Sequence, residues 1–252
     1  MRGSPTAAGE LHLSRVISDA WRLGVHRARF LIGAGACVFV PVGLIEALEL
    51  DQVQVHDFGV FRLLALLLVA VFFAAATLVG EVLYSGVVAA VAKEDHGWPE
   101  QPIGEILRSL PYGRLIAADL VFVGMVTLGL LAFVVPGVLV LTWFSLAAVT
   151  IEVERGGVLA AFRRSRELVR RHFWPTLALM VVVTVLGECL SAGITNLVAI
   201  VLGHSFADRW VEATFSSLVT APVFALPVVS LYFALVALEP PAATSSGTVA
   251  KA

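Results

Sequence analysis

The sequence predicts an all-α integral membrane protein, and three observations support that fold class. Hydrophobic residues make up 59% of the 252 residues and charged residues only 14%, with a mean hydropathy of +0.92. Soluble domains are typically about 45–50% apolar and about 25% charged. Apolar runs long enough to cross a bilayer recur along the chain, and the arginines gather in the polar connections between them. We therefore expect six transmembrane helices.

The chain divides into a membrane domain at 11–238 and two terminal segments. Residues 1–10 and 239–252 are polar, small and in part proline-containing, so we expect both to be disordered. The predicted transmembrane helices lie at about 30–50, 61–92, 114–135, 138–152, 173–202 and 211–238. Pro136-Gly137 is expected to form the tight turn between the third and the fourth span.

Three shorter segments have the i, i+3, i+4, i+7 pattern of amphipathic helices that lie in the membrane interface. These segments are 11–25, 102–112 and 157–171. The apolar arc of the third contains Val158, Leu159, Phe162, Ser165 and Val169. Its opposite arc contains Arg163, Arg164, Glu167, Arg170 and Arg171, with Arg166 at the boundary. We expect these arginines to meet anionic lipid headgroups.

The distribution of basic residues predicts the orientation. With a cytoplasmic N-terminus, 15 of the 17 Lys and Arg residues fall in cytoplasmic segments, and only Arg62 and Arg209 fall outside. Such a bias follows the positive-inside rule. The basic residues are almost all arginine, which is typical of a GC-rich bacterial genome. We therefore predict a multi-pass protein of the bacterial plasma (inner) membrane with both termini cytoplasmic.

The three amphipathic segments each precede a pair of predicted spans, which suggests a threefold internal repeat. Its units would be 11–92, 102–152 and 157–238. The first and third share local sequence, since Ala20-Trp21-Arg22-Leu23 corresponds to Ser165-Arg166-Glu167-Leu168. Internal repeats are common in membrane proteins and often frame a central site.

A second pattern lies between Pro136 and Phe173. A Pro-Gly pair is followed by an apolar run that ends in Glu152 and Glu154. After it come Ala160-Ala161-Phe162-Arg163-Arg164-Ser165 and Leu168-Val169-Arg170. This pattern resembles the glycerophosphoryl diester phosphodiesterase membrane-domain family and related bacterial six-helix membrane proteins of unknown function.

The resemblance covers about 11–238 and departs from that family at the end of the last helix, where Tyr232 is present but the terminal basic residue is missing. The phosphodiesterase activity of that family belongs to a separate soluble barrel, for which this chain has no room. The resemblance therefore implies a membrane module and no enzyme activity.

Ionisable groups inside predicted spans are candidate site residues, because burying one in a bilayer costs at least a few kcal/mol. Glu81 lies in the second span, and Glu188 lies in the fifth with Asn196 two turns later. Asp119 follows Arg114 by five residues, which is compatible with a position at the interface. The structural alternative for each is a protonated carboxyl that is hydrogen-bonded across helices.

Other functional classes find no support in the sequence. The net charge of −2 gives no indication of nucleic-acid binding, and the six histidines have no metal-ligand spacing on one helix. Cys37 and Cys189 lie inside apolar runs, and no phosphate-binding glycine motif is present. We expect no catalytic, metal or cofactor-binding residues.

We therefore expect a non-enzymatic membrane module that interacts with anionic lipid headgroups on the cytoplasmic face or with a partner membrane protein. The alternative is a transporter- or permease-like protein with a cavity lined by Glu81 and Glu188. A lipid-directed enzyme ranks third, since no nucleophile–base pair is visible.

Overall fold

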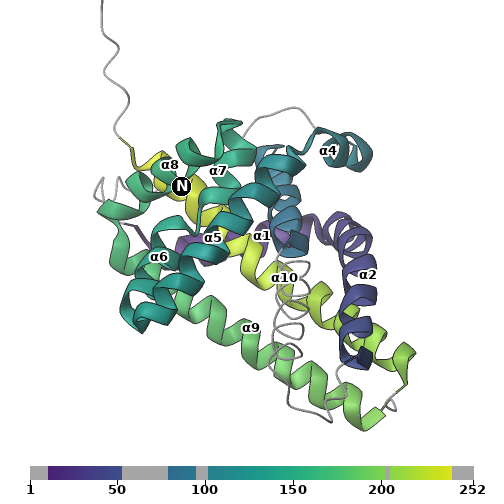
Figure 1. Ribbon diagram of the computed structural model, residues 1–252. Helices are drawn as coiled ribbons and strands as arrows, with labels where there is room; N and C mark the ends of the chain where they lie inside the picture. Colours follow the sequence, from purple (N-terminus) through teal and green to yellow (C-terminus); the bar gives the residue numbers. More distant parts are fainter. Residues whose placement is uncertain (1–10, 53–78, 95–101, 202–204, 240–252) are drawn as a thin grey trace, which may run out of the picture.

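The computed structural model describes residues 11–52, 79–94, 102–201 and 205–239, in which all regular secondary structure is helical (Figure 1). The helices with complete bounds are α1 (Leu13–His26), α2 (Ala28–Gln52), α4 (Ile103–Ser109), α5 (Tyr112–Ala132), α6 (Val134–Phe144), α7 (Ala147–Glu154), α8 (Val158–Arg171), α9 (Phe173–Val201) and α10 (Phe206–Ala237). A further helix occupies 79–94.

Five segments of the described residues are long and apolar enough to cross a membrane. They are Ala28–Ile45, Tyr112–Gly129, Val135–Glu154, Phe173–Val198 and Phe206–Ala237. Between 17% and 44% of the residues in these windows are buried inside the protein, so most of their apolar side chains face outward. Apolar surface on that scale suits lipid and not water. The chain is an all-α membrane protein, and 61–78 of the second predicted span lies outside the described residues.

The helix at 79–94 lies at the centre of the packing. Its fully buried apolar residues are Tyr84, Val87, Val88, Ala89, Val91 and Ala92. Val87 belongs to a hydrophobic cluster with residues of α2, α5, α7 and α8, and the other five belong to a second cluster that includes residues of α1, α2, α9 and α10. A helix that is apolar on all sides is expected to be enclosed by its neighbours.

Helix α10 begins five residues before the predicted span at 211–238. Ser205 and Asp208 form a capping box, in which the Ser205 hydroxyl accepts from the Asp208 N–H over 3.3 Å. In return the Asp208 carboxylate accepts from the Ser205 N–H over 3.0 Å. This satisfies orphan N–H groups of the first turn and extends the helix through a polar stretch.

The predicted turn at Pro136-Gly137 is wrong. The chain bends at Phe133, whose backbone is extended (φ −166°, ψ 152°), and α6 begins at Val134. Pro136 is the third residue of the helix, where its missing N–H has no intrahelical partner in any case. Gly137 lies against Gly129 of α5, and it is Gly129 that permits this close packing: a Cβ there would lie 2.9 Å from the Gly137 Cα.

Two further predicted helices are interrupted. The span at 138–152 is a broken helix, α6 followed by α7, with a turn at Ser145 and Leu146. The segment at 102–112 is also divided, because α4 ends at Ser109 and α5 begins at Tyr112. Leu110 precedes Pro111, which disfavours helical backbone at Leu110, and its observed ψ is 132°.

The amphipathic helices α1 and α8 both have 14 residues, and one residue separates each from the following span. The buried residues of α1 are Val16, Ala20 and Leu23. Those of α8 include Ala161, Ser165 and Leu168, which lie 145 residues later in each case. The buried stripe of α8 packs against protein, and Leu159, which we placed on the apolar arc, is 80% exposed.

Candidate functional site

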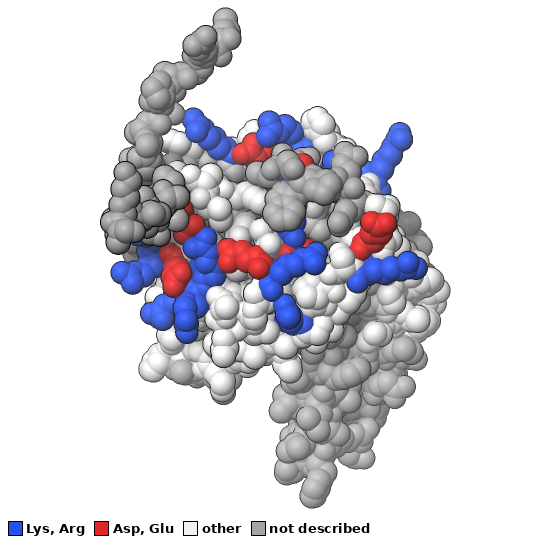
Figure 2. Space-filling model, turned by 90° about the horizontal axis from the view of Figure 1, so that it is seen from above, with Lys and Arg blue, Asp and Glu red and all other residues white. Residues whose placement is uncertain are grey.

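Charged side chains gather on the end of the molecule that carries α4, α7 and α8 (Figure 2). Arg27, at the start of α2, pairs with Glu94 over 3.2 Å. Arg114, in the first turn of α5, donates to the Arg155 carbonyl over 2.9 Å. These contacts bring the charged ends of α2, the helix at 79–94, α5 and α7 together on one face, which we call the charged face.

A buried ion pair lies beneath the charged face. The Lys93 ammonium donates to Glu152 Oε1 over 2.9 Å and to the Glu152 backbone carbonyl over 2.5 Å. Glu152 is only 1% exposed, and its Oε2 atom has no hydrogen-bond partner among the described residues. Such a pair stabilises a fold only while both charges are present. It fixes the centre of the molecule, at 79–94, to the end of α7.

A second network joins α8 to the end of α10. Arg164 donates to Glu154 over 2.9 Å and to both carboxylate oxygens of Glu239 over 2.5 and 2.6 Å. Tyr232 donates to the same Glu154 over 3.0 Å. The hydrogen bonds that Arg164 donates to Glu239 lower the pKa of Glu239 and raise the pKa of Arg164. Glu239, predicted to begin a disordered tail, is therefore attached to the folded unit.

The candidate lipid-binding arginines of α8 fall into two groups. Arg164 is engaged as described, and the Arg166 guanidinium lies 5.1 Å from the centre of the Trp143 ring. Arg163, Arg170 and Arg171 are exposed. These last three are the guanidinium groups of α8 that an external anion can reach most directly.

Ser165 connects α8 to the break between α6 and α7. Its hydroxyl donates to the Trp143 carbonyl over 2.8 Å and accepts from the Leu146 N–H over 3.2 Å. Because the helix is interrupted, neither backbone group has its usual helical hydrogen-bond partner. Ser165 is fully buried. The serine therefore replaces hydrogen bonds that the broken helix has lost.

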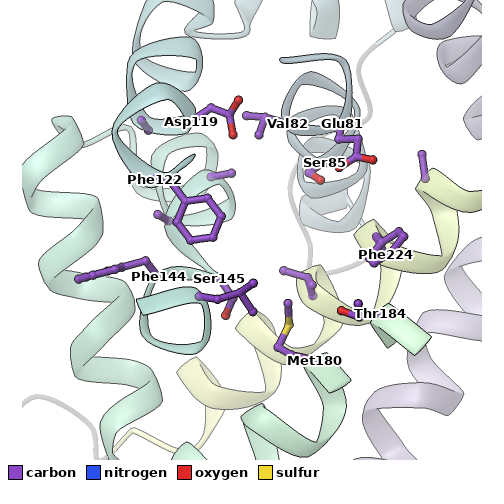
Figure 3. Close-up of a pocket in the computed structure, with 16 residues that line it drawn as sticks. Glu81, Val82, Ser85, Asp119, Phe122, Phe144, Ser145, Met180, Thr184 and Phe224 are labelled. Atoms are coloured by element: carbon purple, nitrogen blue, oxygen red, sulfur yellow. The ribbon is translucent and has the colours of Figure 1, made fainter. Parts of the chain in front are cut away.

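A cavity of about 240 Å³ lies beside this break (Figure 3). Its walls come from the helix at 79–94 and from α5, α6, α7, α9 and α10. Its polar lining residues are Glu81, Ser85, Asp119, Ser145 and Thr184. Its aromatic lining residues are Phe122, Phe144 and Phe224. The cavity thus combines carboxyl and hydroxyl groups with a largely apolar wall.

Only some of the carboxyl groups that we predicted as site residues line this cavity. Glu81 lines the cavity, whereas Glu188 is exposed on α9 and is not a lining residue. Glu188 follows the lining residue Thr184 by one turn, about 6 Å along the helix axis, which places it beyond the cavity. Asn196 is also exposed and donates to the Ala192 carbonyl over 2.8 Å. Asp119, expected at the interface, lines the cavity in place of Glu188.

Comparison with known proteins identifies one family. The model of a domain of unknown function, DUF7847, matches residues 54–240. The chain belongs to this family. No curated protein and no solved structure matches the chain. The DUF7847 match provides no link to the phosphodiesterase membrane-domain family, so that resemblance stays a prediction.

The DUF7847 region includes every residue that lines the cavity and all members of the Arg164 network. Helices α1 and α2 precede it. Sequence reasoning missed the Lys93–Glu152 pair and the role of Asp119. One signal for the pair was present, since Lys93 and Glu152 both end predicted spans on the same predicted side of the membrane.

Proposed function

We propose that this DUF7847 protein is a non-enzymatic membrane module whose charged face binds anionic lipid headgroups. In this proposal it crosses a bacterial plasma membrane six times, with both termini and the charged face in the cytoplasm. The observation that carries the proposal is the exposure of three arginines on α8, Arg163, Arg170 and Arg171, on the charged face. Basic side chains near an anionic leaflet gain about 1 kcal/mol each.

Apolar side chains next to these arginines support the same arrangement. Leu159, 80% exposed, lies one turn from Arg163 on α8, and Trp174, 76% exposed, lies in the first turn of α9. Tryptophan is enriched at the headgroup level of membranes, and exposed leucine beside arginine is typical of helices in the interface. In the proposed orientation these side chains enter the lipid while the guanidinium groups bind phosphate.

The shared buried pattern of α1 and α8 supports an internal repeat. We infer that each forms the interfacial start of a unit that continues into two spans, with α4 as the third such helix. On this proposal α8 is the copy whose surface has gained arginine: α1 has Trp21 where α8 has Arg166, and Val25 where α8 has Arg170.

We prefer this function to the permease-like alternative because Glu188 lies outside the cavity that Glu81 lines. The test is native mass spectrometry of purified protein titrated with phosphatidylglycerol or phosphatidylcholine. The triple variant Arg163→Gln, Arg170→Gln, Arg171→Gln should bind phosphatidylglycerol about tenfold more weakly or worse, with phosphatidylcholine binding unchanged.

A matched triple variant removes the same charge from other helices: Arg22→Gln, Arg29→Gln and Arg108→Gln, all of them exposed residues. It should retain most phosphatidylglycerol binding. Equal losses in the two variants would show that total charge, and not α8, determines the affinity. Unchanged binding in the α8 variant would contradict the proposal.

A further inference from the structure

Asp119 in α5 is a buried carboxyl that lines the cavity and has no partner among the described residues. It is 6% exposed, and neither a hydrogen bond nor an ion pair joins its side chain to any described residue. Figure 3 shows its carboxyl among the side chains that surround the cavity, with Ser85 on the neighbouring helix. A carboxyl group this well buried in a membrane segment is costly unless a partner compensates its charge.

The lining of the cavity restricts the kind of partner. Glu81 is a second carboxyl on the cavity wall. An ionised Asp119 carboxyl by itself favours positive charge in the site. An inorganic cation such as Ca²⁺ needs six to eight oxygen ligands. The described residues contain no group of three or more His, Cys, Asp or Glu side chains able to hold a metal ion. The remaining walls are mainly apolar, which does not suit a dehydrated metal ion.

Three aromatic rings fit an organic cation better. Phe122, Phe144 and Phe224 come from three different helices and line the cavity. The face of an aromatic ring attracts ammonium groups, and an apolar wall accommodates a hydrocarbon body. A volume of about 240 Å³ is below the range of about 300–1,000 Å³ that drug-sized ligands occupy, so it suits a small molecule with a single ring or a short chain.

The broken helix strengthens this assignment. Ser145, at the interruption between α6 and α7, lines the cavity together with Phe144 and Ala147. Interrupted helices in membrane proteins occur where the backbone is buried in protein or lines a cavity, and in transporters they often form binding sites. Here Ser165 satisfies the backbone from the side of α8, which leaves the opposite side of the break facing the cavity.

We propose that this cavity binds a small organic cation, a protonated amine with an apolar body, with Asp119 as the counter-ion. This binding site is independent of the lipid contacts proposed for the charged face. In the proposed complex the ammonium group pairs with the Asp119 carboxylate, and the apolar body contacts the phenylalanine rings.

The test uses calorimetric titration of the purified full chain in detergent with benzylammonium, and with benzyl alcohol as the neutral analogue. Wild-type protein should bind benzylammonium saturably at one site and benzyl alcohol at least tenfold more weakly. Asp119→Asn should weaken benzylammonium binding at least tenfold. Glu188→Gln removes a carboxyl from a neighbouring span outside the cavity and should change the affinity less than twofold.

Absence of saturable benzylammonium binding to the wild type, or equal affinity of Asp119→Asn, would overturn the proposal. Thr184→Leu narrows the cavity without changing its charge and should also weaken binding at least tenfold. If Asp119→Asn does not elute as a single species in size-exclusion chromatography, the Thr184→Leu variant tests whether the ligand binds in the cavity. Wild-type affinity in that variant would place the ligand elsewhere.

Discussion

The hydroxyl of Ser165 in α8 donates a hydrogen bond to the backbone carbonyl of Trp143 in α6 over 2.8 Å. The same oxygen accepts from the Leu146 N–H, so one side chain bridges the two sides of the helix break. The adjacent Arg166 lies over the Trp143 ring. Consecutive residues therefore hold helix α8 against the broken helix, and the exposed arginines of α8 have a fixed position relative to the cavity.

Ser165→Ala should lower the stability of the protein by about 2 kcal/mol, because it leaves a buried carbonyl and a buried N–H unsatisfied. Unfolding in increasing fractions of dodecyl sulfate, followed by circular dichroism, measures the change. Ser217→Ala on α10 is the control, since the Ser217 hydroxyl bonds to no described residue. A loss no larger than that of the control would mean that the break needs no support from α8.

Lys93→Met should lower stability by about 3–5 kcal/mol, because the buried Glu152 carboxylate would lose its ammonium partner. The double variant Lys93→Met, Glu152→Met should recover most of this loss, since an apolar pair replaces an ion pair of similar volume. The same unfolding assay, arranged as a double-mutant cycle, gives the coupling between the two residues. Additive losses would contradict a direct interaction.

Gly129→Ala should destabilise the pair of helices α5 and α6 by about 1–3 kcal/mol, because the added methyl group meets the backbone of Gly137. Backbone atoms cannot move aside as a flexible side chain does. Gly124→Ala on the same helix has nothing within 4 Å of the new carbon and should leave stability unchanged or slightly higher. Thermal unfolding in detergent compares the two variants, and similar midpoints would refute the close approach.

The contact between Arg164 and Glu239 should contribute stability that depends on pH. Because its folded-state pKa is lowered from the ordinary value of 4.5, Glu239 stabilises the protein above that pH and loses this contribution as the pH falls through the folded-state value. Wild-type protein should therefore unfold at a higher temperature than Glu239→Gln at pH 7. The corresponding difference in free energy of unfolding should be that of a partly exposed pair, up to about 1 kcal/mol. At pH 3 the two midpoints should converge; a constant difference would exclude titration of Glu239 as the cause.

Local patterns in the sequence were sufficient to predict much of the helical layout. The apolar runs of α2 and α9 agree closely with the predicted spans 30–50 and 173–202. The amphipathic periodicity of α1 and α8 likewise marks helices within two residues of their observed ends. These features depend on side chains three or four positions apart, which a single sequence displays directly.

Features that depend on distant partners could not be predicted in the same way. The break at Ser145 is stable because Ser165, twenty residues later, satisfies its backbone. Asp119 and Glu188 look alike in sequence, yet packing turns one into the cavity and leaves the other exposed. Which side of a span faces inward is decided by neighbouring helices, because nearly every side chain on these spans is apolar.

The Arg164–Glu239 contact has a consequence for biosynthesis. Helices α9 and α10 both lie between the two residues, which meet on one face of the molecule. A chain with only one of the two helices across the bilayer would hold Arg164 and Glu239 on opposite sides. In a chain whose α9 and α10 both cross the bilayer, the contact can therefore form only once both helices have been inserted, which makes it a chemical mark of completed insertion.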